Sequence, residues 1–238
     1  MRTPNCMQLK IPGNLNPPPP SADFNTLPLG HWCGEREGLY FRLHTINRST
    51  GSPWHPIHFS RRGATRFDPP TGPGTLYVGE TLGGVLLEIF DDSWGPVGSA
   101  SRRLTKAQLN EWWVTLVAVP PIKVFFAHGI NLSKIGTDIQ LLSGDHAIAR
   151  EWALRLAEHP LGIDGIYYPS RHHSGTRNLA IFDRKGWKRG RYNRNLVSKQ
   201  NFTGIDPKGP VVYGPPLLLS QYPGLLRVLS SIEVAVLP

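Results

Sequence analysis

The sequence predicts an α+β domain, because strand-like and helix-like segments follow one another along the chain. Residues 39–43 alternate between apolar and polar side chains, which is typical of a half-buried strand. Two later segments, 82–89 and 145–158, repeat apolar residues at the spacing of an amphipathic helix. Short apolar runs at 114–119, 122–127, 165–169 and 178–182 are strand-like, and the first two are separated by two prolines.

Composition indicates a soluble, cytoplasmic protein. The 238 residues fit one large domain, or one domain with long tails. No apolar run reaches the roughly 18 residues of a membrane span, so we expect no membrane contact. Cys6 and Cys33 are too few for a disulfide framework, which favours a reducing compartment. The formal charge of +9 makes polyanions or phosphorylated ligands plausible partners.

Residues 1–37 predict an extended arm outside the domain. This segment lacks periodic apolar residues and contains Pro17 to Pro20, which favour polyproline conformation. His31 and Cys33 are two potential metal ligands without a second pair, so we expect no zinc site.

The stretch 38–92 carries most of the candidate binding residues. Arg42 projects from the first strand on the face opposite Leu43, either into solvent or into a cleft lined by its neighbours. Arg66 follows a glycine-containing turn with two further arginines, and such a turn either grips phosphate or forms a basic surface loop. Tyr77 lies in the next strand-like run, 75–78.

Glu88 lies at the edge of the apolar stripe of the helix at 82–89, on the side shared by Thr81 and Gly84. A glycine inside a helix costs roughly 1 kcal/mol relative to alanine, so Gly84 indicates that another group packs closely there. The alternative is that Glu88 simply flanks the core and faces solvent.

Farther along, Thr105 to Gln108 has the pattern of a capping box for a short helix running through Trp113. We expect Trp112, Trp113 and Trp152 to belong to the core. Ser170 directly follows a strand end, where binding groups often lie, although most such serines are ordinary turn residues. No Gly-x-Ser-x-Gly elbow surrounds Ser170, so we do not interpret it as a nucleophile.

The C-terminal part is basic. Residues 184–200 mix lysines and arginines with Trp187 and Tyr192, which fits either single-stranded nucleic acid or a solvated loop. The tail from Pro210 either packs on the domain or serves an oligomer contact. The chain has no Walker loop, Rossmann glycine motif or internal repeat.

Taken in order, several motifs between Leu39 and Asp183 resemble the RES domain family, which is named for an arginine, a glutamate and a serine. These motifs are LYFRLH, GATRFDPP, LYVGETLGGVLLEIF, LTKAQL, GIYYPSR and NLAIF. Studied members are bacterial toxins that consume NAD and pair with an Xre-type helix-turn-helix antitoxin. The resemblance implies an ADP-ribosyltransferase-like fold, with small mixed or antiparallel sheets flanked by helices around an NAD cleft. It also implies three parts: the arm 1–37, a catalytic domain 38–183 and a basic extension 184–238.

The resemblance further implies roles for five residues. Glu88, Arg42 and Ser170 would be catalytic, and Arg42, Arg66, Tyr77 and Ser170 would bind NAD or phosphate. It implies no metal and no cofactor, since NAD is the substrate and inorganic phosphate the expected co-substrate. The chain departs from the family at Asp68, where asparagine is common, and at Gly83–Gly84, where alanines are common.

The leading hypothesis is therefore a toxin that cleaves the nicotinamide–ribose bond of NAD by phosphorolysis, giving ADP-ribose 1″-phosphate and nicotinamide. The same cleft also fits transfer of ADP-ribose to a protein or to water. A hypothesis of another class is a basic nucleic-acid-binding protein without activity. We expect an Xre-type antitoxin as partner, with a homo-oligomer possible in that complex.

Overall fold

The computed structural model describes residues 15–46, 54–90, 94, 102–170, 175–185, 187 and 209–237. These residues form a six-stranded sheet in the order β1-β2-β6-β5-β4-β7, and β1 also pairs with β4. The strands are β1 (Cys33–Thr45), β2 (Thr75–Gly79), β4 (Trp112–Phe126), β5 (Gly165–Pro169), β6 (Arg177–Phe182) and β7 (Val211–Leu218). Neighbours run antiparallel apart from β4 and β5, which run parallel, so the sheet is mixed. The α+β prediction is confirmed.

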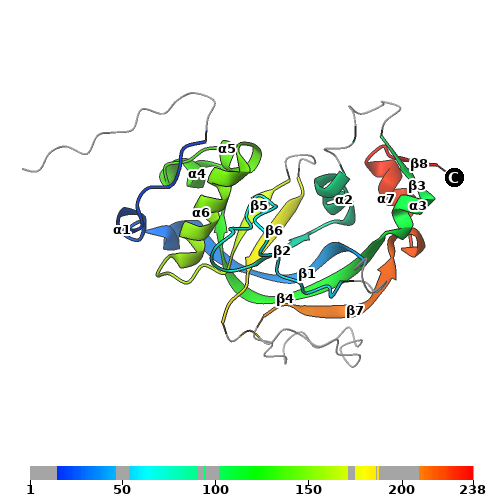
Figure 1. The fold of residues 1–238 in the computed structure, drawn as a ribbon, viewed down its shortest axis with the longest axis horizontal. Coiled ribbons are helices and arrows are strands. Elements are labelled where there is room, and N and C mark those ends of the chain that lie inside the picture. The colour runs from blue at the N-terminus through cyan, green and yellow to red at the C-terminus, as the bar shows by residue number, and fades with distance from the viewer. Residues whose placement is uncertain are drawn as a thin grey trace, which may run out of the picture.

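The two longest strands, β1 and β4, pair from Cys33↔Phe125 to Thr45↔Trp112 and curve together beneath the helices (Figure 1). On its other side, β1 meets β2 at one register position, Phe41↔Gly79. This contact closes the sheet on itself, and the two strands separate beyond it. The separation matters because the candidate site opens there.

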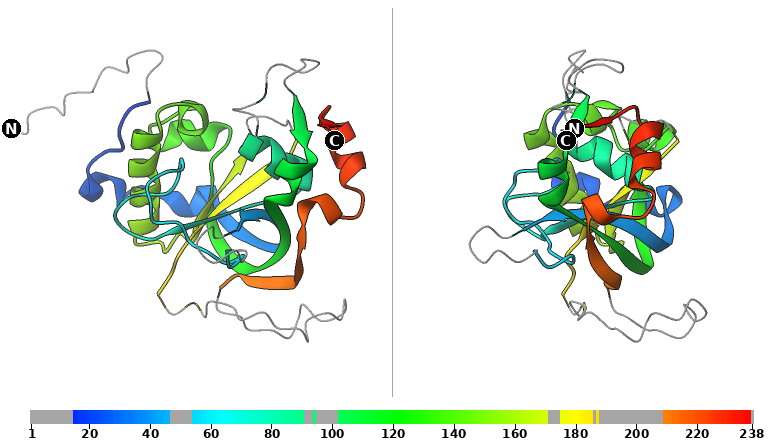
Figure 2. Two further views of the ribbon diagram at one scale, coloured as in Figure 1. Left: turned by 45° about the vertical axis from the view of Figure 1, so that its right-hand side comes forward. Right: turned by 90° about the vertical axis from the view of Figure 1, so that its right-hand side faces the viewer.

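Helices gather at the two ends of the sheet (Figures 1 and 2). At one end lie α1 (Ser21–Phe24), the 3-10 turn η1 (Leu29–Trp32), α4 (Ile130–Lys134), α5 (Gln140–Ser143) and α6 (His146–Glu158). At the other end lie α2 (Leu82–Phe90), α3 (Lys106–Asn110), the 3-10 turn η5 (Leu219–Gln221) and α7 (Leu225–Ser231). There the short parallel pair β3 (Arg103–Thr105) and β8 (Ala235–Leu237) forms a second sheet.

The longer predicted helices are present. The predicted segment 145–158 is α6, with Asp145 as the N-cap residue whose carboxylate accepts a hydrogen bond from the Ala147 N–H at 2.6 Å. Three residues of the predicted apolar stripe at 82–89 are buried in α2 (Leu82, Val85 and Leu86), and the fourth, Ile89, is half-buried and lines the cavity. The predicted capping box at Thr105 is also present, with both reciprocal hydrogen bonds to Gln108.

Two strand and helix boundaries differ from the prediction. Residues 114–119 and 122–127 belong to one continuous strand, β4, which runs through Pro120 and Pro121 as far as Phe126. The prolines lack an N–H for the sheet, but they lie between the residues of β4 that pair with β7 and those that pair with β5. On the other side they lie opposite the irregularity of β1 at Arg36 and Gly38, so they are tolerated. The second helix ends at Asn110, not Trp113, because 112 and 113 pair with β1.

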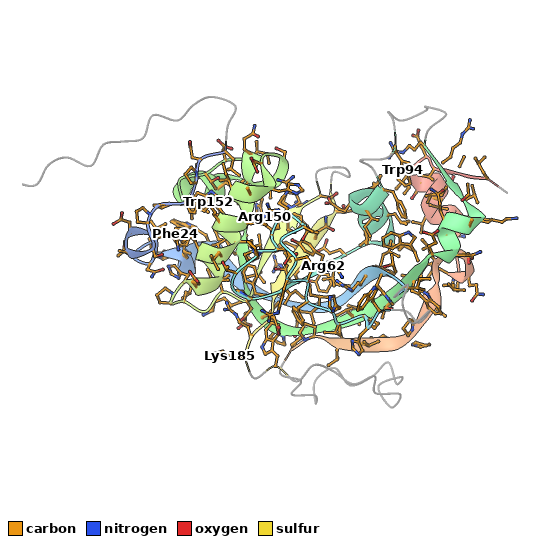
Figure 3. All side chains as sticks on the ribbon, viewed as in Figure 1. Phe24, Arg62, Trp94, Arg150, Trp152 and Lys185 are labelled. Atoms are coloured by element: carbon orange, nitrogen blue, oxygen red, sulfur yellow. The ribbon has the colours of Figure 1, made fainter. Side chains whose placement is uncertain are left out.

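The predicted arm at residues 1–37 is wrong for the part that the structure describes. Phe24 and Leu29 are fully buried in the core cluster around Trp152, and β1 already begins at Cys33. Figure 3 shows Phe24 beside Trp152. The Trp152 indole N–H also donates to the Asn16 carbonyl at 2.8 Å. The helical segments here are four residues long, which is too short to show a periodic pattern.

The C-terminal residues 209–237 extend the domain, since β7 adds to the sheet and α7 packs in a second core cluster with α2. Most of the predicted basic segment, residues 186 and 188–200, lies outside the described residues. Where the chain is described, no helix combines the length and hydropathy needed to cross a membrane.

We predict that Phe24→Ala lowers the free energy of unfolding by about 3–5 kcal/mol, since it empties a fully buried aromatic site. Phe24 packs edge-on against Trp152 and His159, with ring centroids 5.9 and 5.7 Å apart. Chemical denaturation measures the loss. The control is Leu226→Ala, because Leu226 is 71% exposed and its removal should change stability by less than about 0.5 kcal/mol. Equal midpoints for both variants would show that this segment is not part of the domain.

Candidate active site

A cavity of about 500 Å³ opens where β1 and β2 separate, next to α2 and the beginning of α6. This volume lies within the range of about 300–1,000 Å³ that is usual for small-molecule sites. The lining residues that carry polar or aromatic groups are Arg42, Ser60, Thr65, Arg66, Thr75, Tyr77, Glu88, Trp112, His146, Tyr168 and Asn178.

Glu88 and Ser170 meet at this cavity although they are 82 positions apart. The Ser170 hydroxyl donates to Glu88 Oε1 at 2.8 Å, and the Ser170 N–H donates to the Thr176 carbonyl at 3.1 Å. Ser170 is 7% exposed. The serine therefore holds one carboxylate oxygen of Glu88 in a defined orientation.

The glycine pair of α2 brings Glu88 to this position. A Cβ at Gly84 would lie 3.0 Å from Thr176 Oγ1, and a Cβ at Gly83 would lie 3.3 Å from Ile232 Cγ2. The expectation that another group packs closely at Gly84 is confirmed. Side chains at either position would push α2 away from β6 or from the region after α7.

Arg42 ties the separating strands together. Its Nη1 donates to the Tyr77 carbonyl of β2 at 2.9 Å, and its Nη2 donates to the His58 carbonyl at 3.2 Å. Burial lowers the pKa of Arg42 to about 10, so the guanidinium remains charged at neutral pH. Beside it, burial and then the charge of Arg42 lower the pKa of His44 to about 4, which leaves that imidazole neutral. The strand wall thus carries one positive charge, on Arg42.

Tyr77 fixes the turn that carries Arg66. Its hydroxyl accepts hydrogen bonds from the Phe67 N–H at 2.7 Å and from the Thr65 hydroxyl at 3.0 Å. Burial raises the pKa of the Tyr77 hydroxyl, so it stays protonated. The Thr75 hydroxyl, also on β2, holds the same turn by donating to the Phe67 carbonyl at 2.6 Å. Residues on both sides of Arg66 are therefore held by β2.

Arg66 reaches across the cavity to the start of α6. Its Nη1 donates to the Gly144 carbonyl at 2.8 Å, and its Nη2 lies 2.9 Å from His146 Nε2. The neighbouring Arg61 instead pairs with Asp183 at 2.6 Å, and Arg62 is exposed. Of the three arginines in this loop, Arg66 is the one that lines the cavity.

Asp68, the departure noted beside Arg66, is fully buried under the turn. Its Oδ2 accepts a hydrogen bond from the Ser60 hydroxyl at 2.7 Å. The carboxylate expected next to Arg66 is thus directed at Ser60, which lies on the cavity wall.

Arg42, Arg66, Tyr77 and Glu88 all line the cavity, and Ser170 joins them through Glu88. The sequence reasoning missed His146 and Asn178. It also assigned Trp112 wholly to the core, whereas Trp112 is half-buried and lines the cavity. The position of His146 at the start of α6 was a usable signal, and so was the place of Asn178 as the first residue of the NLAIF motif.

The charged groups suit an anionic ligand, bound by the arginines, in which an atom near the carboxylate gains positive charge during a reaction. Two arginines line the cavity with one carboxylate, and guanidinium groups bind phosphate oxygens well. Among the described residues, no cluster of three or more His, Cys, Asp or Glu side chains is placed to hold a metal ion.

Residues 41–202 match the family model of the RES domain, and this range contains all five candidate residues. The fold is similar to that of a chain in the crystal structure of the M. tuberculosis MbcT-MbcA toxin-antitoxin complex. That likeness has a TM-score of 0.58 at 13% sequence identity and covers 87% of this chain and 98% of that chain. No match was found among curated proteins.

We predict that Tyr77→Phe lowers the free energy of unfolding by about 1–3 kcal/mol, because it leaves the Phe67 N–H without its acceptor. Chemical denaturation measures this change. The matched control is Tyr222→Phe, since the half-buried Tyr222 hydroxyl has no hydrogen bond with any described residue. If both variants unfolded at the same denaturant concentration, Tyr77 would not act as the clamp of the turn.

Proposed function

The chain belongs to the RES domain family, and on this premise we propose that it is an NAD-degrading toxin that cleaves the nicotinamide–ribose bond by phosphorolysis. The observation that carries the proposal is the orientation of Glu88 by Ser170 in a cavity lined by Arg42 and Arg66. Glu88 would be the anionic group at the reacting ribose, and the arginines would bind the phosphates.

One carboxylate, that of Glu88, is enough for cleavage of the nicotinamide–ribose bond. In NAD the ribose carbon is bonded to a pyridinium nitrogen, and the bond breaks with both electrons moving to that nitrogen. Nicotinamide then leaves as a neutral molecule and needs no proton, whereas sugar leaving groups of ordinary glycosides need a second carboxyl group as an acid. Glu88 would stabilise the positive charge that develops on the ribose, which is electrostatic help in the transition state.

The arginines supply charge at two places. Arg66, held at the start of α6 by Gly144 and next to His146, would bind a phosphate of the substrate or the incoming phosphate. Arg42 is committed to two backbone carbonyls, so its contribution would be a fixed positive charge in the wall, and its donors mainly hold β1 and β2. A phosphate oxygen would then attack the ribose carbon and give ADP-ribose 1″-phosphate.

Tyr77 and Ser170 would orient the substrate. The ring of Tyr77 lines the cavity while its hydroxyl is occupied by the turn, so the ring face is the part available for stacking on the pyridine ring. Ser170 would act on the reaction through Glu88, whose carboxylate it holds.

We also propose a partner. The similar fold comes from a toxin–antitoxin complex, and a chain that consumes NAD needs restraint in its own cell. An Xre-type helix-turn-helix antitoxin that covers the cavity would supply this restraint in the cytoplasm, where we propose that the protein acts.

The activity is tested by incubating the purified protein with NAD, with and without inorganic phosphate. We expect nicotinamide release that depends on phosphate, together with ADP-ribose 1″-phosphate. Glu88→Gln should lower kcat by about 10²–10³-fold, which is typical for the loss of one preorganised electrostatic group. Nuclear magnetic resonance identifies the products.

The control for the activity is Glu111→Gln, since Glu111 is exposed after the end of α3 and does not line the cavity. Release without phosphate would replace phosphorolysis by transfer to water or to a protein. No NAD consumption, together with salt-sensitive binding of DNA or RNA, would instead support a nucleic-acid-binding protein.

The partner is tested by purifying the tagged protein from cells that express it with the genes next to its own. We expect a small helix-turn-helix protein to co-purify and to suppress NAD consumption. An active protein that purifies alone under these conditions would contradict this part of the proposal.

A further inference from the structure

Asn178 is a buried polar residue on the cavity wall whose side chain is not satisfied by the described part of the protein. It is 4% exposed and lines the cavity from the beginning of β6, where it is the second residue of the strand. Its Nδ2 is buried and has no hydrogen-bond partner among the described residues. A buried amide without a partner destabilises a fold, so Asn178 is better explained by a ligand than by packing.

The fold makes room for this amide. Asn178 pairs with Gly79 of β2 on one side and with Tyr168 of β5 on the other. A Cβ at Gly79 would lie 2.7 Å from Asn178 Oδ1 and 2.5 Å from Val85 Cγ2 of α2. Gly79 is therefore required for space, and its absent side chain lets the amide lie between the sheet and α2.

Asn178 lies near two parts of the proposed site, the Glu88–Ser170 pair and the ring of Tyr77. Two residues before it, Thr176 accepts the Ser170 N–H and so lies next to the Glu88–Ser170 pair. Two residues after it, Ala180 pairs with Tyr77. Asn178 and Ala180 share one face of β6, at a spacing of about 7 Å, and Thr176 directly precedes the strand. Asn178 thus lies between the reacting carboxylate and the proposed stacking ring.

We propose that Asn178 is a substrate-binding residue whose amide donates a hydrogen bond to the carboxamide oxygen of the bound nicotinamide ring. This inference rests on the proposed function, because it assigns a partner within the same site. Glu88 and Asn178 line the same cavity, so a ribose at Glu88 and the pyridine ring attached to it can both lie within it. An asparagine amide is both donor and acceptor, which matches a carboxamide in both respects.

This contact also aids the reaction. Binding the carboxamide fixes the pyridine ring in its plane, so that the bond to ribose points at Glu88. It selects substrates that carry a carboxamide over dinucleotides without one, because a buried amide left unpaired disfavours the latter.

The test compares Asn178→Ala with the unaltered protein on two substrates, NAD and thionicotinamide adenine dinucleotide. In the thio compound a sulfur replaces the acceptor oxygen and accepts hydrogen bonds more weakly. We expect Asn178→Ala to lower kcat/KM on NAD by about 10-fold or more, and to lower it clearly less on the thio compound. The preference of the protein for NAD should therefore shrink by at least about 3-fold. Taking the ratio of the two substrates removes their intrinsic difference in reactivity.

Stability provides a second readout. Because Nδ2 of Asn178 makes no hydrogen bond with the described residues, Asn178→Ala should leave the melting temperature within a few degrees. The exposed Asn110→Ala serves as a matched control that should change neither stability nor preference. An equal loss on both substrates, or a large loss of stability with unchanged preference, would overturn the inference and leave the proposed function standing. No NAD consumption by the unaltered protein would overturn both.

Discussion

The separation of β1 from β2 is the constraint on which the site depends. The two strands meet at one register position, Phe41↔Gly79, and the gap beyond it is bridged by Arg42 donating to the Tyr77 carbonyl. Continuous pairing of these strands would satisfy their backbone groups with each other and would close the space that the cavity occupies. A buried guanidinium compensates for the missing ladder bonds and brings a positive charge to the cavity wall at the same time.

Each other part of the site is positioned by a contact between elements far apart in the chain. β2 holds the Arg66 turn through the Tyr77 hydroxyl, and the start of α6 receives the guanidinium of Arg66. α2 approaches β6 because its two glycines leave room for Thr176 and Ile232, which places Glu88 next to Ser170. Because these contacts share strands, displacement of one element changes the geometry of several functional groups together.

The arrangement also explains why so few charges suffice. In the proposed reaction, the bond to a pyridinium nitrogen needs no acid for its leaving group, so one oriented carboxylate and two arginines would provide the electrostatics. The likeness to the MbcT-MbcA complex at 13% identity concerns the fold, while the chemistry must be argued from the cavity itself. There the hydroxyls of Tyr77 and Ser170 and both Nη atoms of Arg42 are hydrogen-bonded within the protein, whereas Nδ2 of Asn178 has no partner among the described residues.

The sequence by itself determined the parts whose signal is local. The stripe of α2, the cap of α6 and the capping box of α3 arise from residues three or four apart, and the family motifs identified the five candidate residues. Only the tertiary structure decided that residues 15–37 pack into the domain, that β4 passes through its prolines, and that His146, Trp112 and Asn178 line the cavity. Those features depend on contacts such as Arg66 with His146, 80 residues apart. No local pattern encodes such a contact, because each partner alone is an ordinary surface or strand residue until the fold brings the two together.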